Sequence, residues 1–243
     1  MQKYRDFLPT APEELGAFVG LKTVLPVDPF PAEHRGKLAC GVVACFNGSA
    51  GEGQKAMGKL LAELPEPMFN WLGEMPFPAM QSLFDPFYPE GLQWYWRGDF
   101  VKVLTDEAIE AHLAQASKSP SPYSMMHLYP IDGAVQRVGK SDAAWNARDA
   151  TWCMVIVGVD ADPQKAGDLT RWTKNYWEAI HPFSMDGGGY VNFMMDDGDE
   201  RRLKATYGEN YDRLVALKQK YDPANFFSVN QNIKPNGAAA LSR

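Results

Sequence analysis

The stretch that decides the fold is Tyr221-Asp222-Pro223-Ala224-Asn225-Phe226-Phe227-Ser228-Val229-Asn230-Gln231-Asn232-Ile233-Lys234-Pro235. A predicted helix that contains Tyr207 and Leu214 comes before it and ends at Asp222-Pro223, because the residue before a proline disfavours helical backbone. Further upstream lies a second run, which we expect to form a strand: Gly189-Tyr190-Val191-Asn192-Phe193. Aromatic and amide side chains therefore concentrate at this end of the chain.

The two runs together resemble the C-terminal signature of the berberine-bridge-enzyme family of FAD-linked oxidoreductases, within the vanillyl-alcohol-oxidase superfamily. Weaker fragments that fit the same family are Gln81-Ser82-Leu83-Phe84-Asp85, Gly98-Asp99-Phe100, Pro130-Ile131-Asp132-Gly133-Ala134-Val135 and Ala147-Arg148-Asp149-Ala150. The resemblance implies a substrate domain whose antiparallel sheet roofs the flavin ring, with a C-terminal segment that returns to the cofactor. In the family an FAD-binding domain precedes this region. We expect that half to be absent here, as in a truncated or split reading frame.

The resemblance also implies which residues face the flavin. Tyr190 and Asn192 should lie beside it, and Asn230, Gln231 and Asn232 should approach it from the C-terminal segment. Amide side chains suit this task because they can both donate to and accept from the polar edge of the ring. Without the resemblance, the Asn/Gln run would be interpreted as a polar turn.

Two departures from the family pattern concern proton transfer. Many family members have a Tyr-x-Asn-Tyr run whose last Tyr is a base, and Phe193 stands at that position here. A Glu that some members carry on the preceding strand aligns with Met154. We therefore expect Met154 and Phe193 to form an apolar wall of the substrate pocket, without acid-base function. Tyr190, Tyr129 and His127 remain as catalytic candidates. For His127, with an unperturbed pKa of about 6.5, the alternative is a hydrogen-bonded strand histidine.

Apolar patterning predicts an α+β fold: a mainly antiparallel sheet with helices packed on one face, and another face meant to cover a flavin. Predicted strands span residues 38–46, 93–96, 124–128 and 152–159, and predicted helices span 54–64, 105–117 and 162–180. The expected division is a substrate-binding α+β domain over 1–188, the berberine-bridge-like segment over 189–236 and a flexible tail over 237–243.

Composition excludes some functions. The chain has 243 residues with 30 acidic and 24 basic side chains, a net charge of −6 that argues against nucleic-acid binding. No apolar run approaches a membrane span, and no secretory signal is present, so we expect a cytoplasmic protein with no membrane partner. We expect Cys40, Cys45 and Cys153 to be buried, reduced thiols. The four histidines show no metal-binding spacing.

Three functional interpretations stay open. The first is the substrate-binding part of an FAD-dependent oxidoreductase, which moves a hydride from a C–H next to O or N to flavin N5, with oxygen as reoxidant. Because the sequence has no phosphate-binding glycine loop, FAD binding by this chain alone should be weak or absent. The expected partners are a separate FAD-binding domain or chain and a small apolar or aromatic substrate.

The second interpretation is a non-catalytic module that binds a small molecule or a protein. The third is a soluble α+β domain with an accidental match at its end.

Overall fold

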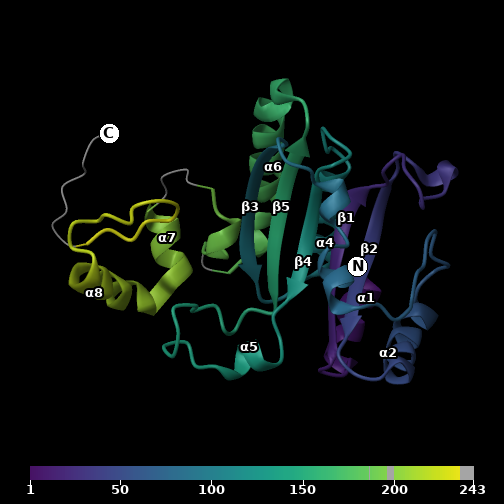
Figure 1. Cartoon of the computed structure of the whole chain (residues 1–243), viewed down its shortest axis with the longest axis horizontal. Coiled ribbons are helices and arrows are strands. Elements are labelled where there is room, and N and C mark those ends of the chain that lie inside the picture. Colours follow the sequence, from purple (N-terminus) through teal and green to yellow (C-terminus); the bar gives the residue numbers. More distant parts are fainter. Residues whose placement is uncertain (186, 196–199, 236–243) are drawn as a thin grey trace.

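The computed structural model describes residues 1–185, 187–195 and 200–235. Its centre is a five-stranded sheet in the order β2-β1-β4-β5-β3, in which every neighbouring pair is antiparallel (Figure 1). The strands are β1 (Leu15–Thr23), β2 (Leu38–Phe46), β3 (Gln93–Val101), β4 (Met125–Pro130) and β5 (Trp152–Asp160). The α+β class with an antiparallel sheet is thus confirmed. The predicted tail over 237–243 lies outside the described residues.

Helices cover one face of this sheet. The α-helices are α1 (Gln2–Phe7), α2 (Ala50–Glu63), α3 (Phe77–Gln81), α4 (Asp106–Ala116), α5 (Ala134–Arg137), α6 (Ala166–Ile180), α7 (Glu200–Tyr207) and α8 (Tyr211–Tyr221). Short 3-10 helices are η1 (Leu8–Thr10), η2 (Ala32–His34), η3 (Asp85–Phe87), η4 (Pro163–Lys165), η5 (His181–Phe183), η6 (Val191–Phe193) and η7 (Gly208–Asn210). Helices α4 and α6 pack against the sheet and against each other.

The interior strand β5 shows why the sheet has two different apolar faces. Every residue of β5 is buried. Side chains alternate along a strand, so Trp152, Met154 and Ile156 join the core under the helices, while Cys153 and Val155 join clusters on the opposite face. We call this opposite face, which α4 and α6 leave free, the open face.

The approach of α6 to β5 depends on a glycine. A Cβ added to Gly158 would lie 2.9 Å from Thr173 Oγ1 and 3.0 Å from Leu169 Cβ, both on α6. Only a residue without a side chain permits this spacing. Leu169 and Tyr176 on the same helix are almost fully buried in the core.

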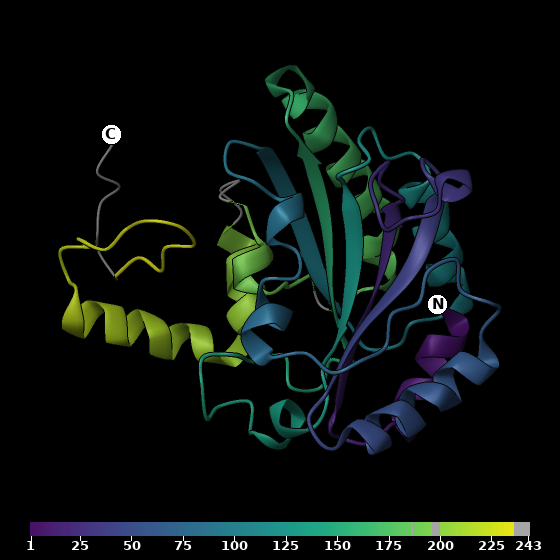
Figure 2. The ribbon, with the colours of Figure 1, turned by 45° about the vertical axis from the view of Figure 1, so that its right-hand side comes forward.

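The C-terminal helices lie beyond the β3 edge of the sheet (Figures 1 and 2). The sequence predicts one helix with a weak point at Gly208. The structure breaks it there, because Gly208 has φ +51° and η7 separates α7 from α8. A single bridge from Met194 to Arg97 pairs the preceding segment with β3 and covers part of that edge.

Two expectations are wrong, and one strand was missed. The Tyr190–Phe193 run is not a strand, since η6 occupies Val191–Phe193. Cys40 and Cys45 are exposed, and only Cys153 of the three thiols is buried. Both exposed thiols lie on β2, an edge strand of the sheet. Strand β1 was not predicted at all.

Candidate functional site

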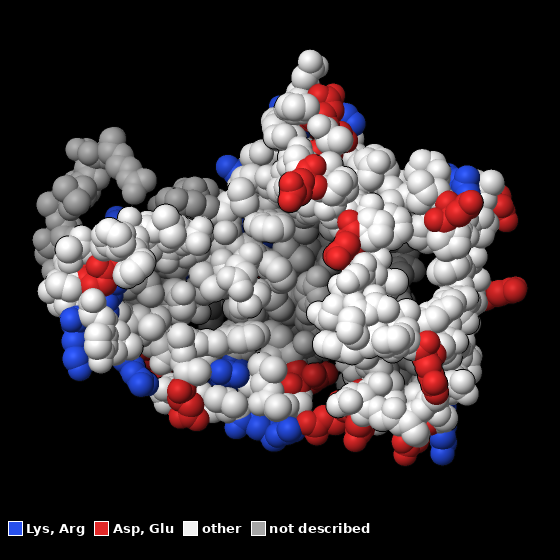
Figure 3. All heavy atoms as spheres, in the orientation of Figure 1, with Lys and Arg blue, Asp and Glu red and all other residues white. Residues whose placement is uncertain are grey.

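The open face is lined by apolar and aromatic side chains. Met125, Val155 and Val157 form one cluster there, with the half-buried Trp96 and Phe193 packed against it. The segment that carries α3 and η3 lies on this side of the sheet, opposite α6 (Figure 2). Seen from the same side, charged side chains lie mostly toward the rim and the middle is largely free of them (Figure 3). Such a surface suits a planar apolar ligand.

His127 and Tyr129, two of the predicted catalytic residues, form a hydrogen-bonded pair on β4. His127 Nδ1 lies 2.8 Å from the Tyr129 hydroxyl, and Phe18 of β1 packs against both rings. Burial, with a smaller effect of Lys22, lowers the pKa of His127 to about 4. Burial, with a smaller effect of Cys153, raises the pKa of Tyr129 to about 12. Both groups are therefore neutral near pH 7, and His127 is a weaker base than an exposed histidine.

Tyr190 and Asn192 lie against the same aromatic surface. Asn192 Nδ2 donates to the Tyr190 hydroxyl at 2.7 Å. The Tyr190 ring stacks on Trp145 at 5.5 Å and meets Phe193 edge-on at 5.1 Å. Phe193 in turn stacks on Tyr129 at 5.9 Å. Tyr129, Phe193 and Tyr190 therefore form one continuous row of rings across β4 and η6.

The C-terminal amide run reaches this region through Gln231. Its Nε2 donates to the Met194 carbonyl at 3.1 Å, directly after η6. Asn230 takes φ +58°, and the Asn232 N–H donates to the Asn230 carbonyl at 2.8 Å, so the run forms a tight turn. Asn residues tolerate this left-handed backbone. The contact of these amides with a flavin stays a prediction.

Met154 is not part of a pocket with Phe193. Met154 is fully buried in the core beneath α6, whereas Phe193 packs on the open face. The alternation of β5 explains the error, since an alignment one residue off turns the side chain to the other face. Val155, the next residue, lies opposite His127 in the β4–β5 register and faces the open side.

Sequence reasoning missed Lys22 and Tyr88. The Lys22 ammonium donates to the Tyr88 hydroxyl at 2.5 Å, and that hydroxyl donates to Met125 Sδ at 3.1 Å. Burial lowers the pKa of Lys22 to about 8 and raises that of Tyr88 to about 12, with a smaller effect of Tyr129. Recognition of β1 as a strand would have placed Lys22 on the same face as Phe18.

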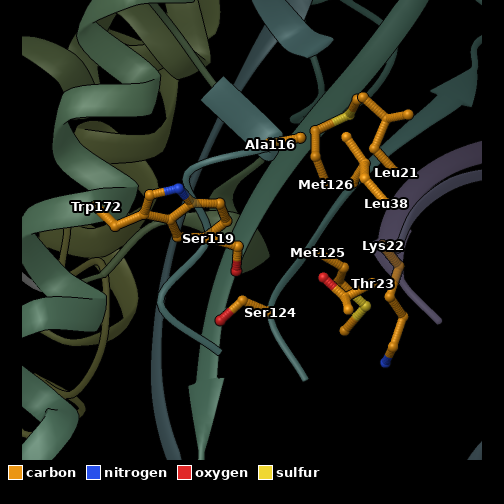
Figure 4. Close-up of a pocket in the computed structure, with 10 residues that line it drawn as sticks. All are labelled: Leu21, Lys22, Thr23, Leu38, Ala116, Ser119, Ser124, Met125, Met126 and Trp172. Atoms are coloured by element: carbon orange, nitrogen blue, oxygen red, sulfur yellow. The ribbon is translucent and has the colours of Figure 1, made fainter. Parts of the chain in front are cut away.

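A crevice that Lys22 itself lines is not the site, because it has no room for a water molecule. Its other lining residues come from both layers, among them Leu21, Met126 and Trp172 (Figure 4). Within the described residues, no group of three or more His, Cys, Asp or Glu side chains could hold a metal ion. None of the described helices is long and apolar enough to cross a membrane.

Known proteins resemble this chain in its C-terminal segment, in its sequence and in its fold. The family model described as berberine and berberine like matches residues 189–234. An FAD-linked oxidoreductase of Dictyostelium discoideum is 29% identical over 196 residues, which are 80% of this chain and 42% of the relative. The berberine bridge enzyme-like protein C-2 of Nicotiana tabacum is 25% identical over 172 residues, covering 57% of this chain and 30% of the relative.

The fold is that of solved berberine bridge enzymes. The structure from Eschscholzia californica superposes with a TM-score of 0.77 at 17% identity, over 98% of this chain and 52% of that chain. Berberine-bridge-like protein 28 of Arabidopsis thaliana gives 0.74 at 17% identity, over 96% of this chain and 52% of that chain. The chain thus spans about half the length of these solved relatives, and less of the curated ones.

The fold is that of solved berberine bridge enzymes, and residues 189–234 match the berberine-like family model. The chain is thus similar to FAD-linked oxidoreductases of the berberine-bridge-enzyme type. The boundary between the substrate-binding domain over 1–188 and the berberine-bridge-like segment over 189–236 stays a prediction.

Proposed function

We propose that the chain is the substrate-binding part of an FAD-dependent oxidoreductase, completed by an FAD-binding domain or chain. The observation that carries this proposal is the open face, whose row of rings ends at Tyr190 and Asn192, with Gln231 close by. FAD, when bound, accepts a hydride at N5 from a C–H next to O or N and is reoxidised by oxygen.

The residues present fit a flavin. A planar ring needs a flat, water-free surface and polar groups at one edge. The open face supplies such a surface through the half-buried rings of Trp96, Tyr129 and Phe193, which pack over Val155 and Val157. The amides of Asn192 and Gln231 can supply the second, since each still has an oxygen that accepts and an N–H that donates.

The roles of the chain's own residues follow from these positions. Phe193, which packs over Val155 on this face, excludes water from a small apolar or aromatic substrate. Tyr129 holds its proton at the phenol oxygen, shared with His127 Nδ1 at 2.8 Å. That pair can orient a substrate oxygen or nitrogen and pass a proton between the two rings.

An exposed aromatic turn supports the proposed partner. Phe226, Phe227 and Val229 expose 80%, 74% and 73% of their surfaces, next to the amide run. Large apolar side chains grouped in this way usually mark an interaction site. The solved relatives are about twice as long as this chain, so an FAD-binding half is the partner that fits the proposal.

The proposal is tested by co-expressing the chain with an FAD-binding half of its class and recording the visible spectrum without oxygen. Aromatic alcohols and amines should bleach the flavin absorbance, and admission of air should restore it. A stable yellow complex that no compound of the panel bleaches would contradict the oxidoreductase role.

One observation favours the second interpretation, a non-catalytic binding module. Phe193 stands where many family members carry a base, and burial makes His127 a weak one. In the same experiment, such a module would bind members of the panel, for instance with a change in Trp96 fluorescence, and leave the flavin oxidised.

A further inference from the structure

The position of the Lys22 ammonium calls for a negatively charged ligand. Lys22 lies on the open face near the end of β1, in register with Met125 of β4 and Ala39 of β2. Within the described residues, its one hydrogen-bond acceptor is the neutral Tyr88 hydroxyl, and no carboxylate lies within ion-pair distance. An ammonium has three N–H donors, so two are left for a ligand.

The surroundings of this cation are aromatic. The Tyr88 ring lies 4.8 Å from Nζ and 5.5 Å from the Trp94 ring, which is 5.8 Å from Trp96. Trp94 is partly exposed although it is a large apolar residue. In Figure 4 the Lys22 side chain points away from Trp172 and the helix layer. The Lys22 ammonium therefore lies at the border of an apolar surface that the Tyr88, Trp94 and Trp96 rings form.

We propose that Lys22 and Tyr88 form a binding subsite for the carboxylate of an aromatic ligand whose apolar body lies along the open face. Burial of an ammonium without a counter-ion is unfavourable, and a bound carboxylate removes that cost by forming a charge-assisted hydrogen bond. The Tyr88 hydroxyl fixes the direction of Nζ. This subsite rests on the proposed function and makes it more specific, because it implies that the aromatic substrate carries a carboxylate.

The groups around Lys22 set the pH dependence. Burial lowers the Lys22 pKa to about 8, Tyr88 on one side and Tyr129 on β4 have raised pKa values, and His127 is neutral above about pH 4. The register partner on β2, Ala39, does not titrate. Carboxylate affinity should therefore be greatest between about pH 5 and 8 and fall as Lys22 loses its proton at higher pH.

The test compares 3-phenylpropanoate with 3-phenylpropanol, which differ in charge and have similar apolar bodies. Both are titrated into the full chain at about pH 7, and tryptophan fluorescence or calorimetry reports binding. The acid should bind about tenfold more tightly than the alcohol, the size expected for a hydrogen bond to a charged group. Lys22→Met should remove this preference and leave alcohol binding within about twofold. Lys22→Arg should keep it.

The control variant is Lys59→Met, on the exposed side of α2, which should leave both affinities unchanged. Equal binding of acid and alcohol, an acid preference that survives Lys22→Met, or no binding of the acid up to its solubility would each overturn the subsite. Displacement of the acid by riboflavin in a Lys22-dependent manner would assign Lys22 to the flavin and overturn it as well. None of these readouts needs FAD or turnover, so failure of the subsite is distinguishable from failure of the oxidoreductase proposal.

Discussion

Arg202 of α7 donates to the fully buried carboxylate of Asp99 on β3, with 2.9 Å between Nη2 and Oδ1. The other carboxylate oxygen lies 2.8 Å from His181 Nδ1. Arg202 Nη2 also donates to the Gly98 carbonyl. This ion pair joins the berberine-like segment to the edge of the sheet, and so fixes the position of Tyr190 and Gln231 relative to the open face.

Loss of this arginine should destabilise the protein strongly. Arg202→Met leaves the buried Asp99 carboxylate with His181 as its remaining charged partner, and loss of one partner from a buried ion pair typically costs about 3–5 kcal/mol of unfolding free energy. The control is Asp168→Asn, which breaks the exposed pair with Arg171 and should cost less than about 1 kcal/mol. Urea unfolding of the two variants measures both. Equal midpoints would show that the Asp99 pair does not anchor the segment.

Gly20 should be intolerant of a side chain because of His127. A Cβ at Gly20 would lie 2.8 Å from His127 Cδ2, so Gly20→Ala should cost about 1–3 kcal/mol through overpacking. The His127→Ala background removes the ring and should reduce that cost by at least about 0.5 kcal/mol. A double-mutant cycle by thermal or urea unfolding gives the coupling. Additive effects would mean that the ring is not over Gly20.

His112, which is fully buried, and His127, which is half-buried, should make stability fall in mild acid. Burial lowers the pKa of His112 to about 3 and that of His127 to about 4, whereas unfolded histidine titrates near 6.5. The unfolded state thus binds more protons between these values. Stability should be complete above about pH 6.5 and decrease toward pH 4, by up to about 1.4 kcal/mol per pH unit and histidine. His127→Asn should make the decrease shallower, and an unchanged slope would contradict its half-buried, neutral state.

The three thiols should separate by reactivity. Cys40 and Cys45 are exposed, while burial, with a smaller effect of Asp99, raises the pKa of Cys153 to about 12. A thiol reagent reacts with the thiolate, so two thiols should react rapidly in the folded protein and the third only after denaturation. The Cys153→Ser variant should keep the fast phase at full amplitude. One fast thiol instead of two would mean that an edge-strand cysteine is covered.

The sequence predicts those elements whose apolar pattern is clear. Strand β5 is an apolar run that is buried along its whole length, and Leu169 and Tyr176 belong to the buried stripe of α6. The apolar run of β2 also predicts a strand, although its residues are only half-buried or exposed. Strand β1 escapes prediction because two of its open-face positions, Gly16 and Gly20, have no side chain to complete the alternation. The η6 segment has strand-like residues, but Gly189 brings its backbone against β3, where a Cβ would lie 2.5 Å from the Gly98 carbonyl oxygen.

The same limits apply to the candidate site. The C-terminal motif names Tyr190, Asn192 and Gln231, which lie in or beside η6; their contact with a flavin stays a prediction. It cannot show that Met154 faces the helices, because a register error of one residue inverts a strand. Lys22 and Tyr88 are far apart in the sequence and meet only through the packing of the η3 segment on β1 and β4.

The measurement that tests the central claim most directly is methyl NMR of methionine-labelled protein during titration with riboflavin and FAD. Met125 lies on the open face, whereas Met126 and Met154 lie in the core beneath the helices. A flavin on the open face should shift the Met125 methyl signal through its ring current and leave the Met126 and Met154 signals nearly unchanged, even when binding is weak. Shifts of Met126 or Met154 alone, or none at the solubility limit of the flavin, would contradict the assignment of the open face to a flavin.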